Sequence, residues 1–76
     1  EETRRMKEEG NVLFRSKQYR GAIAQYTEAL GHMPADCVPL QKDRAVLFHN
    51  RAVCYHCLDQ TDAVIADATA ALQLDP

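Results

Sequence analysis

The sequence has no long apolar run and no one-sided charge, and these absences exclude several classes of protein. No stretch approaches the roughly 20 apolar residues that a membrane-spanning helix needs. Glu1, Glu2, Arg4 and Arg5 do not form the start of a signal peptide. The net charge is −2, so no strong field attracts nucleic acid. We therefore expect a soluble chain that binds neither nucleic acid nor a membrane.

Cysteine is also scarce. The three cysteines are an odd number and do not form the dense, even pattern of a disulfide-stabilised secreted domain, so we expect a reduced, cytoplasmic protein. Cys54 and Cys57 form a C-x-x-C with His56 inside it and His49 nearby, which leaves a zinc site as an alternative. No second ligand pair stands at a suitable spacing, and cysteine often packs in helices as a small hydrophobic residue. We expect no metal and no cofactor.

Recognisable catalytic patterns are missing as well. His49 and His56 are candidates for acid–base chemistry, but no serine, cysteine or carboxylate stands at a spacing that would make a nucleophile with them. The expected function is therefore binding rather than catalysis, and we predict no enzymatic activity.

The sequence does contain helical periodicity, and nothing in it alternates like a strand. The length suffices for one small domain, and apolar residues recur at intervals of three and four in four segments. We expect an all-α fold of four helices whose apolar sides carry these residues: Met6, Gly10, Leu13 and Phe14; Tyr19, Ala22, Ile23, Tyr26, Ala29 and Leu30; Val46, Leu47, Phe48, Ala52, Tyr55 and Leu58; Val64, Ile65, Ala68, Ala71 and Leu72.

Capping signals predict where these helices begin and end. The first helix is expected from Thr3 to about Ser16, and a short connector makes the second helix antiparallel to it. The second helix should stop at Gly31. Pro39 marks residues 35–42 as a loop with a turn of helix at its end. The remaining predicted N-caps are Asp43 for the third helix and Thr61 or Asp62 for the fourth.

The two helix pairs repeat each other at a spacing of 42 residues. Small residues recur where helices must cross closely, and Gly10 belongs to this set. Glycine costs a helix interior about 1 kcal/mol relative to alanine, so we expect Gly10 to permit close packing against a neighbouring helix. The aligned pairs are Gly10 with Ala52, Leu13 with Tyr55, Ala22 with Val64, Tyr26 with Ala68, Ala29 with Ala71, and Pro34 with Pro76.

This repeat resembles the tetratricopeptide repeat family. The matching residues are Gly10, Leu13, Ala22, Tyr26, Ala29 and Pro34 in the first unit, and Ala52, Tyr55, Ala71 and the LDP of residues 74–76 in the second. The second unit departs from the family pattern at Val64 and Ala68. The resemblance implies one domain over 1–76, with repeat one at about 3–36, a loop at 37–44 and repeat two at 45–76. It also implies antiparallel helix-turn-helix repeats stacked as a right-handed α-solenoid.

Within that family the chain is similar to the carboxylate-clamp co-chaperones. The matching residues are Lys7 and Asn11 in the KEEGN stretch and Asn50 in the NRA of residues 50–52. The resemblance implies that Lys7 pairs with the terminal carboxylate of an acidic Glu-Glu-Val-Asp tail of a cytosolic heat-shock chaperone, and that Asn11 and Asn50 hydrogen-bond to that tail. Phe14 is an expected apolar wall of the same groove. Asparagine is a poor helix former, so two of them inside helices call for a ligand.

Three further expectations accompany this interpretation. A complete clamp also takes a lysine and an arginine from a third repeat, so the resemblance implies that these 76 residues belong to a longer protein. The rival interpretation is a structural scaffold that binds another folded domain, or a copy of itself, through the apolar edge of the fourth helix. Arg51 is expected to form an ion pair or to lie on the convex side.

Overall fold

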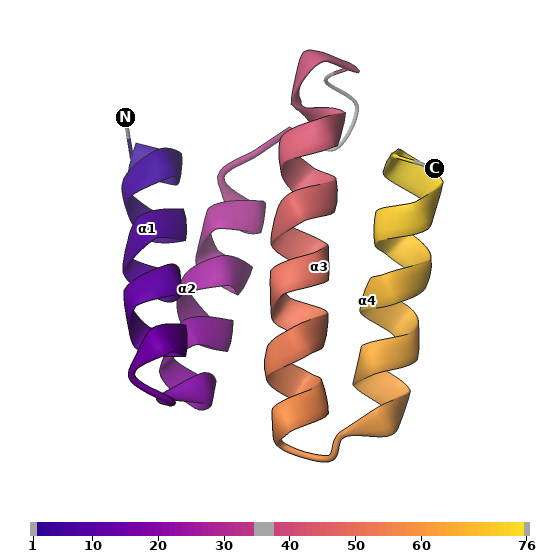
Figure 1. The fold of residues 1–76 in the computed structure, drawn as a ribbon. Coiled ribbons are helices and arrows are strands. Elements are labelled where there is room, and N and C mark those ends of the chain that lie inside the picture. The colour runs from indigo at the N-terminus through magenta and orange to yellow at the C-terminus, as the bar shows by residue number, and fades with distance from the viewer. Residues whose placement is uncertain (1, 35–37, 76) are drawn as a thin grey trace.

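Four α-helices arranged as two antiparallel pairs form the fold (Figure 1). The computed structural model describes residues 2–34 and 38–75. The helices are α1 (Glu2–Arg15), α2 (Tyr19–Gly31), α3 (Gln41–Cys57) and α4 (Thr61–Leu74), and a 3-10 turn, η1 (Val38–Leu40), leads into α3. The described residues contain no strand. The predicted all-α architecture of four helices is therefore confirmed.

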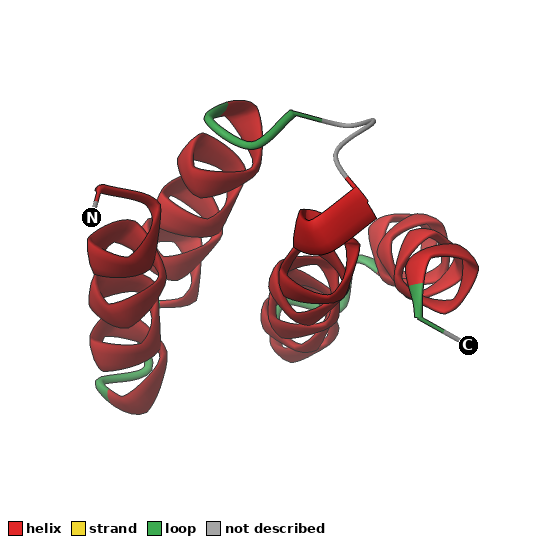
Figure 2. Ribbon diagram, turned by 90° about the horizontal axis from the view of Figure 1, so that it is seen from above, coloured by secondary structure: helices red, strands yellow, loops and turns green. Residues whose placement is uncertain are grey.

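Each helix packs against the next one along the chain. α1 packs on α2, α2 packs on α3, and α3 packs on α4. Seen from above, the α1–α2 pair and the α3–α4 pair stand side by side (Figure 2). This arrangement brings α1 and α3, the first helix of each pair, to the same face of the molecule. The architecture is that of a helical repeat.

The turns inside the two pairs have the same geometry. Lys17 and Asp59, which stand 42 positions apart, both adopt a left-handed conformation, with φ of 64° and 60°. In each turn two backbone amides donate back to the end of the preceding helix, which is the Schellman arrangement. The bonds join Lys17 N to Phe14 O (2.9 Å), Gln18 N to Leu13 O (2.8 Å), Asp59 N to His56 O (3.0 Å) and Gln60 N to Tyr55 O (3.0 Å). The repeat found in the sequence is thus repeated in the backbone.

Three of the four helices begin earlier than predicted, while α2 begins at Tyr19, directly after the predicted connector. The four residues expected as N-caps all lie inside helices: Thr3, Asp43, Thr61 and Asp62. Leu40 precedes α3 and Gln60 precedes α4, and neither makes a side-chain capping bond. The predicted caps are wrong because η1 and the Schellman turn lead the backbone directly into these helices. Asp43 and Asp62 lie in first turns, where a negative charge complements the helix dipole.

The core lies where the helices cross, and its centre is the contact between Gly10 and Tyr26. Tyr26 is 1% exposed, and Ala22 and Ala29 on the same helix are fully buried. A Cβ added to Gly10 would lie 2.6 Å from Cε1 of Tyr26. Glycine at this position therefore lets the tyrosine ring lie directly on α1, which confirms the close packing predicted from the sequence.

Three residues of the predicted apolar stripes are exposed. Ile65 and Leu72 on α4 are 60% and 65% exposed, and Val46 on α3 is 41% exposed. Val64 and Ala68 are half-buried, and the one buried residue of α4 is Asp67. The side of α4 that carries Asp67 faces α3, so part of its apolar surface remains open to solvent.

Two alternatives raised by the sequence concern membranes and metals. Within residues 2–34 and 38–75, no helix has both the length and the apolar character needed to cross a bilayer. The same residues contain no group of three or more His, Cys, Asp or Glu side chains arranged to hold a metal. Cys54 is fully buried, Cys57 is exposed, and Cys37 lies outside the described residues. Burial raises the pKa of the Cys54 thiol to about 11, and Cys54 packs as a small hydrophobic residue.

Candidate functional site

A hollow of about 490 Å³ lies between α1 and α3, with α2 behind it. Three of the four residues predicted as binding residues line it: Asn11 and Phe14 from α1, and Asn50 from α3. The complete set of lining residues is Asn11, Phe14, Arg15, Tyr26, His49, Asn50 and Val53. The structure therefore brings together two asparagines that stand far apart in the sequence.

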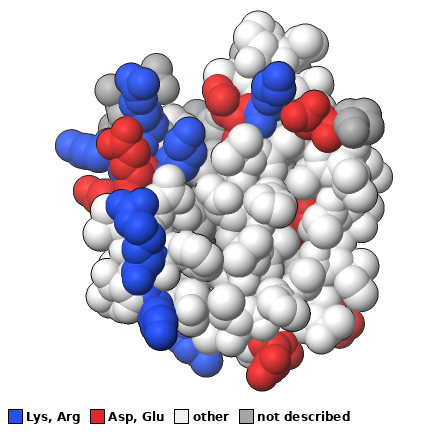
Figure 3. All heavy atoms as spheres, viewed as in Figure 1, with Lys and Arg blue, Asp and Glu red and all other residues white. Residues whose placement is uncertain are grey.

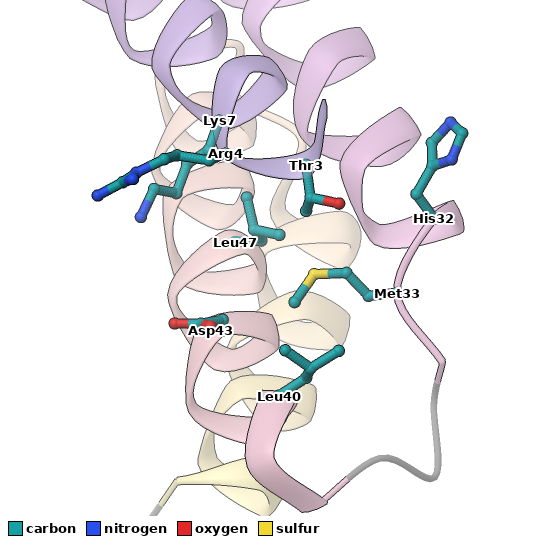
Figure 4. Close-up of a pocket in the computed structure, with 8 residues that line it drawn as sticks. All are labelled: Thr3, Arg4, Lys7, His32, Met33, Leu40, Asp43 and Leu47. Atoms are coloured by element: carbon teal, nitrogen blue, oxygen red, sulfur yellow. The ribbon is translucent and has the colours of Figure 1, made fainter. Parts of the chain in front are cut away.

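The fourth predicted residue, Lys7, lines a second hollow of about 360 Å³ (Figure 4). Lys7 and Arg4 point the same way from α1, while Asp43 stands on the α3 wall and apolar side chains lie between them. Lys7 and Asn11 are one helical turn apart, so the two hollows follow each other along α1. We call them together the α1–α3 groove. The second hollow is lined by Thr3, Arg4, Lys7, His32, Met33, Leu40, Asp43 and Leu47.

The amide of Asn11 is held in one orientation by Tyr26. The Tyr26 hydroxyl donates a 2.5 Å hydrogen bond to Oδ1 of Asn11. Burial raises the pKa of Tyr26 to about 12, so the hydroxyl keeps its proton at neutral pH. Because the Asn11 oxygen is occupied, its Nδ2 remains as the free end of the amide, and no described residue accepts a bond from it. Asn11 therefore presents a hydrogen-bond donor to the groove.

The groove carries more positive than negative charge, although the whole chain has a net charge of −2. Its lining contains three cationic side chains, Arg4, Lys7 and Arg15, and one carboxylate, Asp43. Among the described residues, Lys7 and Asn50 have no hydrogen-bond or ion-pair partner. Figure 3 shows that lysine and arginine side chains gather on the α1 side of this face. The arrangement suits an anionic ligand that accepts hydrogen bonds.

Phe14 provides an apolar wall whose position is fixed by a neighbouring ring. Phe14 is half-buried, and its ring meets that of Tyr19 edge to face, with centroids 5.7 Å apart and an interplanar angle of 63°. Val53 of α3 lines the same hollow. A ligand in the groove therefore meets polar donors and apolar walls together.

Arg51 lies outside the groove and joins three helices. Its guanidinium donates to both carboxylate oxygens of Asp67 on α4, at 2.7 and 2.8 Å, and to Oγ1 of Thr27 on α2, at 2.9 Å. It also stacks near the rings of Phe48 and Tyr55, at 5.4 and 5.9 Å from their centroids. The Asp67 hydrogen bond raises the pKa of Arg51. The expected ion pair of Arg51 is confirmed, and its role is to fix α4 and α2 against α3.

Arg44 makes a second connection between the helix pairs. Its Nη1 donates to the carbonyl oxygens of Leu30, at 3.3 Å, and Met33, at 3.0 Å, at the end of α2. The Leu30 oxygen also accepts a bond from the Met33 amide, so the guanidinium adds to the backbone bonds that close the end of α2. Because Met33 lines the second hollow, Arg44 helps to position the floor of the groove.

Sequence reasoning missed Arg15, His49 and the hydroxyl of Tyr26 as parts of the site. One signal was present, because Arg15 lies four residues after Asn11 and therefore on the same face of α1. His49 directly precedes Asn50, but neighbours in a helix point in different directions, so the sequence alone gave it no special place.

Comparisons with known proteins find similar segments in proteins of different names. Sperm-associated antigen 1A of Danio rerio is 35% identical over 72 residues, which cover 95% of this chain and 17% of that protein. Sperm-associated antigen 1 of Rattus norvegicus is 36% identical over 70 residues, covering 92% of the chain and 7% of the relative. Protein unc-45 homolog B of Xenopus tropicalis is 39% identical over 70 residues, which cover 92% of this chain and 7% of that protein. No family model and no solved structure matches the chain.

The chain spans 7% to 17% of the length of these relatives. The matching segment is therefore a small part of each relative, and it recurs in proteins that otherwise differ in name. The two helix pairs and the repeated turns make this segment an all-α helical repeat.

Proposed function

We propose that this chain is a protein-interaction module whose α1–α3 groove binds the acidic C-terminal tail of a partner protein. The observation that carries the proposal is the set of unpartnered donors on one face: Lys7, the amide nitrogen of Asn11, and Asn50. The chemistry fits a tail such as the Glu-Glu-Val-Asp end of a cytosolic heat-shock chaperone, which is the tail implied by the clamp resemblance. In this role the chain is a binding module rather than an enzyme.

Each residue of the groove has a separate task in this proposal. The ammonium of Lys7 pairs with the terminal carboxylate, and Asn11 and Asn50 donate hydrogen bonds to the carboxylate and the peptide backbone. Phe14 packs against an apolar side chain of the tail. Charge-assisted hydrogen bonds contribute about 1.5 to 3 kcal/mol each when they are sheltered from water, so a few of them give a weak and reversible complex.

The spacing along α1 fits an extended peptide. Four helical residues advance by about 6 Å, and an extended strand advances by about 3.3 Å per residue. The distance along the axis from Lys7 to Asn11 therefore corresponds to about two residues of the bound tail. An extended peptide of four or five residues would span both hollows of the groove.

The rival function uses a different surface. Ile65 and Leu72 leave apolar area exposed on α4, and a structural scaffold would bind a folded domain or a second copy of the chain there. Sedimentation at increasing concentration tests this function directly. Self-association that Ile65→Ser and Leu72→Ser abolish would favour it, while a monomer that still binds the acidic peptide would favour the groove.

Titration calorimetry with two peptides tests the proposed function. One peptide ends in Glu-Glu-Val-Asp with a free carboxylate, and the other has the same sequence with an amidated end. We expect Lys7→Ala to weaken binding of the free-carboxylate peptide by about tenfold, because one charge-assisted bond is lost. Lys42→Ala is the matched control, because Lys42 is exposed on α3 and lines neither hollow. Equal affinities for the two peptides, or equal effects of the two substitutions, would refute the proposal.

A further inference from the structure

Arg15 and His49 line opposite walls of the hollow that contains Asn11 and Asn50. Arg15 comes from the last turn of α1, and His49 comes from α3 beside Asn50. Both side chains are exposed, and neither forms a hydrogen bond or ion pair with another described residue. They are therefore available to a ligand without first breaking an existing contact.

We propose that Arg15 and His49 form a second anion-binding point of the groove, which takes an acidic side chain located about two to four residues before the carboxyl end of the bound peptide. This inference deepens the proposed function and rests on it. The first anion-binding point recognises the terminal carboxylate, and the second selects the side chain that the peptide carries upstream.

The charge of this hollow supports a carboxylate as the ligand. No Asp or Glu lines it, so Arg15 is its one permanently charged side chain. The planar guanidinium presents parallel N–H donors that match the two oxygens of a carboxylate, and an imidazole N–H on the opposite wall adds a third donor. A basic side chain placed here would gain none of these bonds, and a neutral amide would offer one uncharged acceptor oxygen in place of two charged ones.

The electrostatic influence of Arg15 reaches the interior of the groove. Burial raises the pKa of Tyr26 to about 12, and the positive charge of Arg15 acts in the opposite direction. The guanidinium is therefore close enough to Tyr26 to affect its hydroxyl, which holds Asn11. Arg15 belongs to the same electrostatic environment as the predicted binding residues.

The position of Arg15 sets the register of the peptide. Arg15 lies one helical turn beyond Asn11, or about 6 Å along α1, which corresponds to about two residues of an extended chain. A peptide that continues toward Arg15 brings its third residue from the end beside the guanidinium when its carboxylate lies at Asn11, and its fifth when the carboxylate lies at Lys7. The third and fourth residues from the end of a Glu-Glu-Val-Asp tail are both glutamates.

A thermodynamic cycle between chain and peptide tests this inference. The peptides are the free-carboxylate tail and two versions in which one glutamate at a time is replaced by glutamine. The chains are the wild type, Arg15→Ala and the matched control Arg20→Ala, since Arg20 is an exposed arginine of α2 that lines neither hollow. We expect Arg15→Ala to weaken binding by about two- to fivefold, as for other exposed charge pairs, and Arg20→Ala to leave binding unchanged.

The coupling between the two changes is the decisive result. In wild-type chain, glutamine in place of the glutamate that meets Arg15 should weaken binding, and in Arg15→Ala the same peptide change should have a clearly smaller effect, because only His49 remains. His49→Ala should give a smaller loss at the same peptide position. The inference is wrong if Arg15→Ala weakens peptide binding no more than Arg20→Ala does. It is also wrong if the peptide change weakens binding by the same factor in the wild-type and Arg15→Ala chains.

The two proposals fail in distinguishable ways. If wild-type chain binds the free and amidated peptides equally, or binds neither, the carboxylate site itself is wrong and the second point falls with it. If wild-type chain discriminates between them and Arg15→Ala shows no coupling, only the second point is wrong. Thermal unfolding followed by circular dichroism verifies that each variant is folded, and Arg15→Gln provides a variant that keeps the length of the side chain.

Discussion

Replacement of Gly10 by alanine sets two effects of known size against each other. Alanine is favoured over glycine in a helix interior by about 1 kcal/mol, so helix propensity alone predicts a more stable protein. The added Cβ would lie 2.6, 2.9 and 3.0 Å from three ring atoms of Tyr26. The ring is 1% exposed and its hydroxyl is bonded to Asn11, so it cannot move without losing contacts. Overpacking costs about 1 to 3 kcal/mol, and a disturbed hydrogen bond costs about 1 more. We therefore expect a net loss of about 1 to 3 kcal/mol in the free energy of unfolding.

Urea denaturation followed by circular dichroism measures this loss, and the chain supplies two controls. At Gly31 an added Cβ would meet nothing within 4 Å, so Gly31→Ala should leave stability unchanged or slightly increased. At Gly21 the Cβ would lie 3.3 Å from the flexible end of Leu13, so Gly21→Ala should fall between the other two. A Gly10→Ala protein as stable as the Gly31→Ala protein would show that the close contact with the Tyr26 ring carries no cost.

Three other predictions concern the contacts around the groove. Asp67→Asn removes the anionic partner of Arg51, so it should lower the free energy of unfolding, measured by urea denaturation, by about 1 to 3 kcal/mol. An unchanged free energy of unfolding would count against the connection that Arg51 makes between three helices. Tyr26→Phe removes the hydroxyl that orients the Asn11 amide and should weaken binding of the free-carboxylate peptide by about fivefold. Equal calorimetric affinities of the wild-type and Tyr26→Phe chains would contradict this. Burial raises the pKa of Cys54 from 9.0 to about 11, so the folded state favours the neutral thiol. The contribution of this thiol to the free energy of unfolding should be complete below pH 9 and disappear between pH 9 and 11. A Cys54→Ala protein should show a smaller decline in stability over that pH range.

The helices and their repeat could be predicted because they depend on local pattern. The apolar spacing of three and four gives the four helices, and the small residues at Gly10 and Ala52 mark the same crossing in both pairs. The helix starts could not be predicted from capping residues. Asp43 and Thr61 have suitable side chains, but η1 and the Schellman turn begin the helices earlier through the backbone.

The site was predictable only where single residues carried a signal. Lys7, Asn11 and Asn50 stood out because of residue type and resemblance, and the structure places them along one groove. Arg15 carried only the signal of its position one helical turn after Asn11, and His49 carried none, because an exposed polar residue becomes part of a site only when the opposite helix is in place. The partner of Arg51 depended in the same way on the packing of α4 against α3.

Nuclear magnetic resonance of the ¹⁵N-labelled chain, titrated with the free-carboxylate peptide, tests the groove most directly. Side-chain NH₂ groups of asparagine give resolved signals, so the proposed donors report on their own bonds. We expect the Nδ2 signals of Asn11 and Asn50 to show the largest shifts, and the backbone signals around Ile65 and Leu72 to remain in place. Shifts confined to α4, with both asparagine side chains unaffected, would contradict binding in the α1–α3 groove.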